Sequence, residues 1–309
     1  MMITRRSFQF RLGLASPAVA TMLVLLAPQA RAQKSYPTPD QAASALVDAV
    51  KDGTRRAMLK VLGPGADDII ESGDTVADAA TRKQFLVAYD AKHSISSEGN
   101  KNATLIVGTD DFPFPIPLVH QQSGWEFDPV AGRREILYRR IGRNELDAIQ
   151  TSLAYVDAQN EYADKDRTGD GAGVYAQRIV SSPGKKDGLY WNDDHDQSPL
   201  GELAAQASSE GYKIGTGPAP YHGYYFRILK GQGYNAPGGP LYYVVRGKMI
   251  GGFALVAYPA EYGNSGVMTF VVNHTGTVYQ KDLGPRTDII AKRMVLFDPD
   301  QTWKKVDNE

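Results

Sequence analysis

The chain changes its pattern about halfway along, and this change restricts the folds that are open to it. Up to about residue 162, apolar residues recur at helical spacing behind helix starts such as Thr38-Pro39 and Asp128-Pro129. Beyond that point glycine and tyrosine become frequent, and short strand-like segments follow one another between turns. We therefore expect an α+β fold with a helix-rich first half and a strand-rich second half.

The first half is expected to combine helices with a small antiparallel sheet. Helices are predicted from Pro39 to the stop at Gly53, from Thr54 onward, and near residues 78–91. Strands are predicted at residues 104–107, 112–117 and 124–128. The segment 112–117 carries three prolines on one face. Because proline cannot donate to a strand ladder, this segment must be an edge strand or an extended lid.

A long helix over residues 129–162, bent at Gly142, is expected to connect the two halves. A short helix at residues 198–209 comes next, and an antiparallel meander follows it. The turn at residues 273–276 is the clearest hairpin signal. The strands of the meander are predicted at residues 224–229, 241–245, 252–258, 267–272 and 277–281.

Residues 1–32 have the features of an export signal. The pair Arg5-Arg6 precedes a mildly apolar run over residues 12–27, and Ala30-Arg31-Ala32 supplies the small residues that a signal peptidase needs. The arginine pair resembles a twin-arginine signal, and a Sec signal with two incidental arginines is the alternative. The mature chain would begin at Gln33 and would be periplasmic or secreted.

Charge and composition restrict the partners of the mature chain. Residues 1–32 hold four arginines and no acid, so the remaining residues carry 30 basic and 35 acidic side chains, a formal charge of −5. A nucleic-acid partner is not expected, because it would need a basic face. After residue 32 no apolar run approaches the ~20 residues of a membrane span. The chain has no cysteine, which excludes disulfides and a thiol nucleophile.

Several long phrases resemble the bacterial family catalogued as domain of unknown function 2950, whose members are exported proteins of uncharacterised function. The resemblance covers essentially the whole mature chain and implies no established activity. The phrases are FPFP at 112–115, RIGRNEL at 140–146, DGLYW at 187–191, SPLG at 198–201, GYYFRIL at 223–229 and MIGGFALVA at 249–257.

Two further resemblances concern architecture. Residues 33–143 resemble the cystatin-like (nuclear transport factor 2-like) fold, in which helices precede a sheet. Residues 144–309 resemble the globular domain of pilins, in which a helix and a glycine-rich loop precede a meander. True pilins keep an apolar N-terminal helix for filament packing, whereas Arg140, Arg143 and Glu145 stand in the corresponding helix here. The shared fold would therefore not imply assembly into a pilus.

The segment 164–171 is the best candidate for a ligand site. Asp164, Asp166, Thr168 and Asp170 supply oxygen atoms at alternate positions, which is how a calcium loop wraps a hard cation. The twelfth position holds Tyr175 in place of the bidentate Glu of an intact EF-hand. The sequence thus favours two interpretations, a weak Ca²⁺ site or a solvated polar loop.

No catalytic residue can be assigned from the sequence, because no nucleophile, P-loop or zinc motif is present. The acid-rich segment 192–196 is interpreted as a solvated turn. We expect a non-catalytic binding or structural protein of the bacterial envelope, whose partner is an envelope protein or a small ligand. Two alternatives remain open: a periplasmic hydrolase with an acid pair or a bound metal, and an assembly or adhesion factor.

Overall fold

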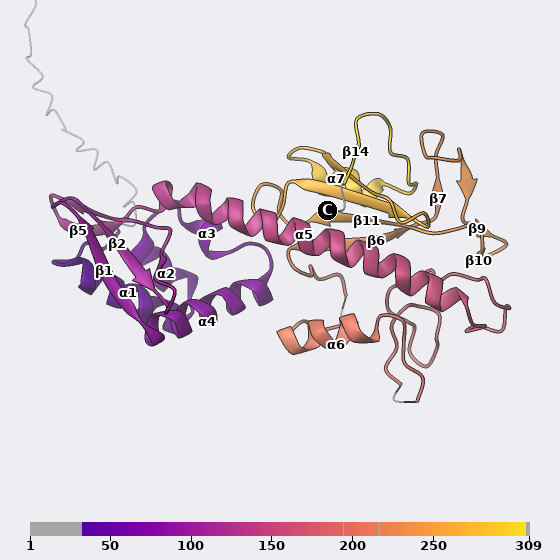
Figure 1. Cartoon of the computed structure of the whole chain (residues 1–309), viewed down its shortest axis with the longest axis horizontal. Coiled ribbons are helices and arrows are strands. Elements are labelled where there is room, and N and C mark those ends of the chain that lie inside the picture. The colour runs from indigo at the N-terminus through magenta and orange to yellow at the C-terminus, as the bar shows by residue number, and fades with distance from the viewer. Residues whose placement is uncertain (1–32, 194, 216, 307–309) are drawn as a thin grey trace, which may run out of the picture. The chain divides into compact units, whose positions relative to one another are not determined.

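In the computed structural model, the predicted helices and strands follow one another in the predicted order, and further short elements lie between them (Figure 1). The structure describes residues 33–193, 195–215 and 217–306. The predicted export signal, residues 1–32, lies outside the described residues. The fold is α+β, and its sheets are antiparallel. None of the helices in the described part has the length and apolar character of a membrane span.

Four helices open the described chain. Thr38 and Thr54 cap the first two through side-chain oxygens that accept from Gln41 N–H and Ala57 N–H, as the capping signals predict. Asp74 caps the fourth helix in the same way. The helices are α1 (Pro39–Asp52), α2 (Arg55–Leu62), α3 (Asp67–Ile70) and α4 (Thr75–Ala91).

The first sheet has the strand order β1-β2-β4-β5, and β3 pairs with β2. Ala103, Leu105 and Val107 of β2 alternate with more exposed residues, so this face is buried under α1 and α4. The predicted edge segment at 112–117 pairs over two residues only, because the prolines that follow have no N–H to donate. The strands are β1 (His93–Glu98), β2 (Asn102–Val107), β3 (Phe112–Pro113), β4 (Leu118–Gln121) and β5 (Gly124–Phe127).

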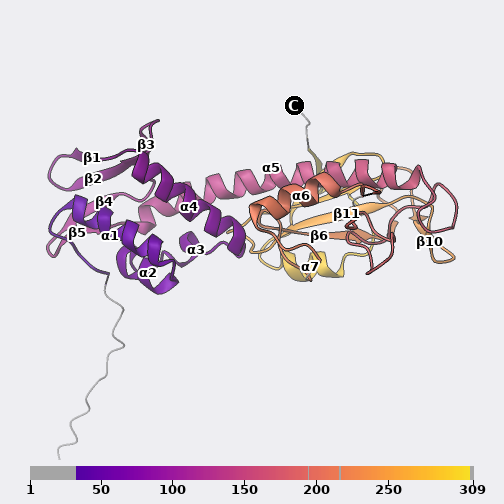
Figure 2. The ribbon, with the colours of Figure 1, turned by 90° about the horizontal axis from the view of Figure 1, so that it is seen from below.

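The connecting helix α5 (Pro129–Ala163) runs without interruption through Gly142. Just after Gly142, the buried side chain of Asn144 donates to Ser265 O at 2.9 Å. Along its second half, α5 packs against the second sheet (Figure 2). After α5 the chain forms a long loop and then α6 (Gly201–Glu210).

The second sheet has the strand order β14-β13-β12-β11-β6 and contains four of the five strands predicted for the meander. The predicted strand at 241–245 is not part of it, because those residues pair with other short strands outside this sheet. Every residue of β11 is buried, which requires cover on both faces. One face is covered by α5 and the other by α7 (Thr287–Arg293) (Figures 1 and 2). The strands are β6 (Tyr224–Leu229), β11 (Ala254–Pro259), β12 (Met268–Asn273), β13 (Val278–Asp282) and β14 (Lys304–Lys305).

Two short hairpin-like pairs extend from the second sheet. The pair β7 (Gly231–Gln232) with β8 (Leu241–Tyr242) is followed by β9 (Val244–Val245) with β10 (Lys248–Met249). Tyr224 and Tyr243 are fully buried, whereas Tyr234 and Tyr242 are more than 80% exposed. The tyrosines of this region therefore serve mostly as core residues, apart from those two.

Apolar side chains collect in separate clusters along the chain. Two clusters lie within residues 36–127, and a larger one lies within residues 148–297. The helix α5 contributes Ile136 to the first group and Ala148, Tyr155 and Val156 to the second. The described residues nevertheless form one compact unit. The division into modules at 33–143 and 144–309 stays a prediction.

Candidate functional site

The loop after α5, in which the sequence predicts calcium ligands, folds around Asp166. The Oδ1 atom of Asp166 accepts hydrogen bonds from the N–H groups of Thr168, Gly169 and Asp170, at 3.3, 2.7 and 3.0 Å. Desolvation alone would raise the pKa of Asp166, but these bonds outweigh it and lower that pKa. One carboxylate oxygen of the predicted site is thus occupied by the backbone.

Asp170, the last of the four predicted ligands, is occupied as well. Its Oδ1 pairs with Lys248 Nζ at 2.8 Å, and its Oδ2 accepts from Thr168 Oγ1 at 3.0 Å. Asp164 is the C-cap of α5. Within the described ranges, no group of three or more acidic or histidine side chains is arranged to hold a metal ion. Calcium binding stays a prediction, and a bound ion would compete with Lys248 for Asp170.

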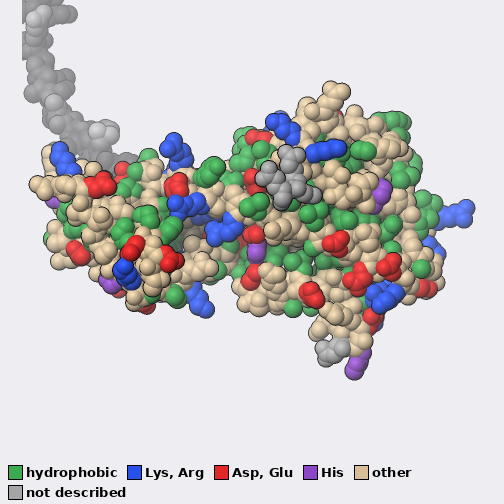
Figure 3. All heavy atoms as spheres, in the orientation of Figure 1, with side chains coloured by type: hydrophobic (Ala, Val, Ile, Leu, Met, Phe, Trp, Pro, Cys, Tyr) green, Lys and Arg blue, Asp and Glu red, His purple; other side chains and the backbone are tan. Residues whose placement is uncertain are grey.

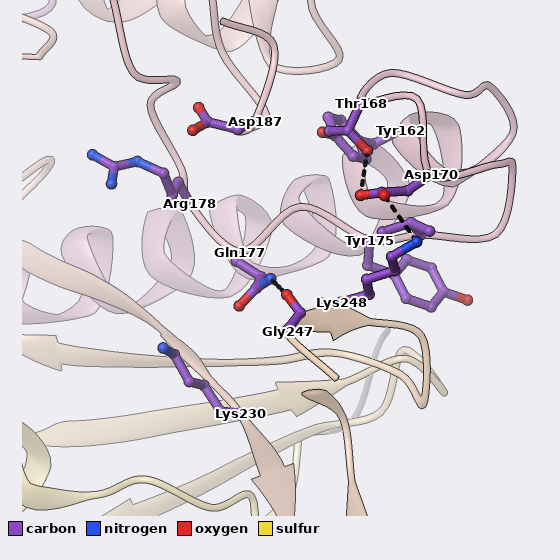
Figure 4. A pocket seen from close by; sticks show the side chains of 11 residues that line it. Tyr162, Thr168, Asp170, Tyr175, Gln177, Arg178, Asp187, Lys230, Gly247 and Lys248 are labelled. Atoms are coloured by element: carbon purple, nitrogen blue, oxygen red, sulfur yellow. Dashed lines mark hydrogen bonds and ion pairs between the residues drawn. The ribbon is translucent and has the colours of Figure 1, made fainter. Parts of the chain in front are cut away.

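The same loop forms one wall of a polar hollow of about 370 Å³ (Figure 4). The opposite wall is the turn between β9 and β10. Gln177 Nε2 donates to Gly247 O at 2.7 Å, and Tyr175 N–H donates to Met249 O at 2.7 Å. Together with the Lys248–Asp170 pair, these bonds hold the two walls in a fixed register.

Two cations line the hollow away from the Lys248–Asp170 pair. Arg178 and Lys230 lie on one side of Figure 4, and the pair lies on the other. Arg178 Nε donates to Val180 O at 3.2 Å. Within the part of the chain that the structure describes, neither Arg178 nor Lys230 has a carboxylate oxygen within 4.0 Å. Both cations therefore line the hollow without a direct ion-pair partner among the described residues.

Asp187 also lines the hollow, but its oxygens are already bonded. They accept from Ser182 N–H at 2.7 Å and from Ser182 Oγ at 2.8 Å. Burial would raise the pKa of Asp187, yet these hydrogen bonds and the nearby Arg178 charge lower it. Asp187 is thus a charged carboxylate that Ser182 of the same loop holds in place, with one hydrogen bond to each oxygen.

A second charged cluster surrounds His222. Its Nδ1 lies 2.8 Å from Asp147 Oδ2, and its Nε2 lies 2.6 Å from Glu210 Oε2. The bond to Asp147 and then the bond to Glu210 raise the pKa of His222 to about 9, against the opposing effect of desolvation. At neutral pH the ring is protonated and both nitrogens donate, so neither can accept a proton as a general base.

The acid-rich segment 192–196 is part of an ion-pair network rather than a free turn. Lys186 Nζ lies 3.0 Å from Asp193 Oδ2 and 2.6 Å from Asp196 Oδ2. Arg167, which is 3% exposed, adds a second cation to Asp196 at 3.2 Å. The carboxylates of Asp193 and Asp196 are therefore paired with cations within the protein.

Sequence patterns did not identify Arg178, Lys230 or the partners of His222. Arg178 and Lys230 come from segments more than 50 residues apart, and Asp147 is 75 residues from His222. No regular sequence spacing links the members of these pairs, because only tertiary packing brings them together. A single Arg, Lys, Asp or His in a sequence does not indicate such a partner.

Comparison with known proteins gives one match. A family model described as "Protein of unknown function (DUF2950)" matches residues 33–306. Neither the curated proteins nor the solved structures contain a match to the chain.

Proposed function

The chain belongs to the DUF2950 family of proteins of unknown function, and we propose that it is a non-catalytic binding protein of the bacterial envelope. The ligand that fits the hollow beside Gly247 is a small polar molecule with a carboxylate or phosphate group. The observation that carries this proposal is the pair of cations, Arg178 and Lys230, that line the hollow without an ion-pair partner among the described residues.

The chemistry of the hollow supports an anionic ligand. A guanidinium group binds a carboxylate or phosphate through its planar fork, and a nearby ammonium adds a second positive charge. Gln177 and Thr168 add neutral hydrogen-bonding groups to the lining. Lys248 pairs with Asp170, so the charges left in the lining are Arg178, Lys230 and the Asp187 carboxylate, which Ser182 holds in place. The lining therefore carries one more cation than anions.

The state of His222 supports a binding role over hydrolysis. A hydrolase that used this ring would need one nitrogen free to accept a proton from water or a nucleophile. Here both ring nitrogens lie against carboxylates, at 2.8 and 2.6 Å. The cluster is therefore suited to holding α5 and α6 together through charge, and the hydrolase alternative gains no residue from it.

The envelope location rests on residues 1–32. Changing Arg5 and Arg6 together to Lys should stop export if the twin-arginine route is used, because the pair is the recognised element of that signal. Fractionation followed by immunoblotting would measure this. Changing Arg11 to Lys is the control, and it should leave export unchanged. A normal periplasmic yield of the double variant would instead indicate the Sec route.

Ligand binding is tested by thermal unfolding of the purified protein with inorganic phosphate and with citrate. Binding to the native state should raise the melting temperature in a saturable way. The variant Arg178→Gln/Lys230→Gln should lose this effect, whereas Lys83→Gln, an exposed cation on α4, should keep it. An equal response of both variants, or no saturable response of the wild type to either anion, would contradict the proposal.

A further inference from the structure

A second hollow, of about 320 Å³, lies beside the start of α6. It shares no lining residue with the hollow that contains Arg178. Two aromatic side chains and four hydrogen-bonding side chains form most of its wall. They are Tyr190, Trp191, Asn192, Asp193, Gln197 and Ser198.

The N-terminus of α6 reaches this hollow without a cap. Its N-cap residue is Leu200, which has no side-chain acceptor, and no side chain bonds the first turn. The N–H groups of Glu202 and Leu203 have no hydrogen-bond partner among the described residues. Most helices satisfy these groups with a Ser, Thr, Asp or Asn cap or with another acceptor, so an external acceptor would find them open.

Ser198 gives an independent indication of a missing partner. The residue is only 5% exposed, and its Oγ has no hydrogen-bond partner among the described residues. A buried hydroxyl without a partner is rare and costs free energy. The hollow also borders Gly201, where a Cβ would lie 3.3 Å from Gln197 Cγ and 3.4 Å from Ser198 Oγ, in close contact with both side chains.

The charges around this hollow disfavour an anion. The described residues of the wall include no lysine or arginine, and Glu202 lies in the first turn of α6, so a carboxylate or phosphate would find no positive side chain there and a nearby acid. The nearby cation Lys186 is already engaged by Asp193 and Asp196. The site therefore needs a ligand that accepts hydrogen bonds without carrying negative charge.

We propose that this hollow binds a neutral polyhydroxy ligand, a sugar ring. Each sugar hydroxyl both donates and accepts, which matches the amides of Asn192 and Gln197 and the Ser198 hydroxyl. The C–H face of a sugar ring is apolar and packs against aromatic side chains, which Tyr190 provides at the wall. This site is separate from the hollow that contains Arg178, and the two hollows are proposed to bind different classes of ligand.

Saturation-transfer NMR with glucose, galactose and N-acetylglucosamine tests the proposal on the full mature protein. At least one of these sugars should bind saturably to the wild type. Ser198→Ala should weaken its binding about tenfold through the loss of a hydrogen bond. Because this change removes a buried hydroxyl without a partner, the melting temperature should stay the same or rise. Weaker sugar binding without a loss of stability would show that Ser198 contacts the ligand and is not needed for the fold.

Gly201→Ala is a second test variant, in which sugar binding and the melting temperature should change in the same directions as in Ser198→Ala. The added methyl group would press against Gln197 and Ser198 in the wall, so sugar binding should weaken. Alanine also favours the helix, so the melting temperature should not fall. Ser209→Ala, at the other end of α6, is the matched control and should bind sugar normally. Arg178→Gln/Lys230→Gln should also bind sugar normally.

Three outcomes would overturn the proposal. The first is that no sugar of the panel binds the wild type at millimolar concentration. The second is that Ser198→Ala and Gly201→Ala bind as well as Ser209→Ala. The third is that inorganic phosphate competes with the bound sugar for this hollow, which would show that the site prefers an anion.

Discussion

Asp74 uses its two carboxylate oxygens for different purposes. Its Oδ1 caps α4 by accepting from Val76 N–H and Ala77 N–H, at 3.1 and 3.0 Å. Its Oδ2 accepts from Tyr212 Oη–H and Gly223 N–H, both at 2.9 Å. The residue is 1% exposed. One side chain therefore caps the start of a helix in the first half and holds a loop of the second half in place.

This double role predicts an unusually large effect of Asp74→Ala. Loss of the cap costs about 1 kcal/mol, and each buried donor left without a partner costs about 1–3 kcal/mol more. Asp128→Ala is the matched control, because Asp128 caps α5 through the same two kinds of bond, at 3.1 Å each. Urea unfolding of both variants measures the difference. Equal losses would mean that the bonds to Tyr212 and Gly223 contribute nothing.

His222 should give the protein a pH-dependent stability. Its pKa rises from 6.5 to about 9 on folding, so its contribution is complete below pH 6.5 and is lost as the pH rises through 9. The free energy of unfolding of wild type minus His222→Gln should therefore shrink over that range. His195→Gln changes an exposed histidine and is the control. A difference that stays constant from pH 6 to 10 would contradict this.

The caps show which residues could be predicted from the sequence. Thr38, Thr54 and Asp128 bond N–H groups two or three positions ahead, and that spacing is visible in the chain. The second oxygen of Asp74 bonds residues 138 and 149 positions away. No local sequence pattern encodes such a distant partner. For the same reason the sequence did not identify Arg178 and Lys230 as neighbours in the hollow beside Gly247.

Among the elements, α5 contains two glycines with opposite surroundings. Gly142 has open space where a Cβ would stand, whereas a Cβ at Gly132 would lie 2.5 Å from Pro115 O. The expectation of a bend at Gly142 came from the low helix propensity of glycine alone. The helix continues because packing on both sides of this position holds it, through Arg140 to Asp68 O at 2.7 Å and Asn144 to Ser265 O at 2.9 Å.

Alanine at these two glycines should therefore act in opposite directions. Gly142→Ala should stabilise the protein by about 0.5–1 kcal/mol, because alanine loses less backbone entropy in a helix. Gly132→Ala should destabilise it by about 1–3 kcal/mol through the clash with Pro115. Chemical denaturation measures both. A loss of stability in Gly142→Ala would mean that glycine is required there for a bend.

The loop at 164–170 allows a direct test of calcium. If Asp164, Asp166, Thr168 and Asp170 hold Ca²⁺, millimolar calcium should raise the melting temperature relative to chelator. The rise should disappear in Asp164→Asn/Asp166→Asn. It should persist in Asp157→Asn, which changes an exposed acid of α5. Identical melting curves of the wild type with calcium and with chelator would leave the loop as a self-bonded turn.

Regular elements with clear apolar patterns could be predicted, and polar or short ones could not. Four strands of the second sheet, β6, β11, β12 and β13, lie where the sequence predicts them, because apolar residues run along them, as in β11. The predicted strand at 241–245 lies outside that sheet. In contrast, β1 reads HSISSE and is almost entirely exposed, so only its pairing with β2 makes it a strand. The seven-residue α7 has no cap side chain to announce it.

At the scale of the whole molecule, separate cores are joined by polar bonds. Asn264 Nδ2 donates to Glu71 O at 2.9 Å, and Arg140 donates to Ile69 O at 2.7 Å and also to Asn264 Oδ1. These bonds connect α3 and its surroundings to the loops of the second sheet. Polar contacts of this kind can be replaced by water when the halves separate, which apolar contacts cannot.

A fragment of residues 144–309 is therefore expected to fold alone. It contains the whole core cluster of residues 148–297, and the polar groups it would expose can bond water. Circular dichroism and a cooperative urea transition would measure this. A fragment of residues 164–309 lacks the α5 residues Tyr155, Val156 and Tyr162 of that core and should stay unfolded. Failure of the longer fragment to fold would rule out independent modules.

The position of α5 in the chain also sets the order of events during synthesis. Its second half carries Tyr155, Val156 and Tyr162 for a core whose strands are all made later. Until β11 and β12 emerge, that apolar stripe has no sheet to cover it. The nascent chain thus passes through a stage in which the first half can be folded while the apolar side of α5 is still exposed. Chaperones bind and chains aggregate at such stages.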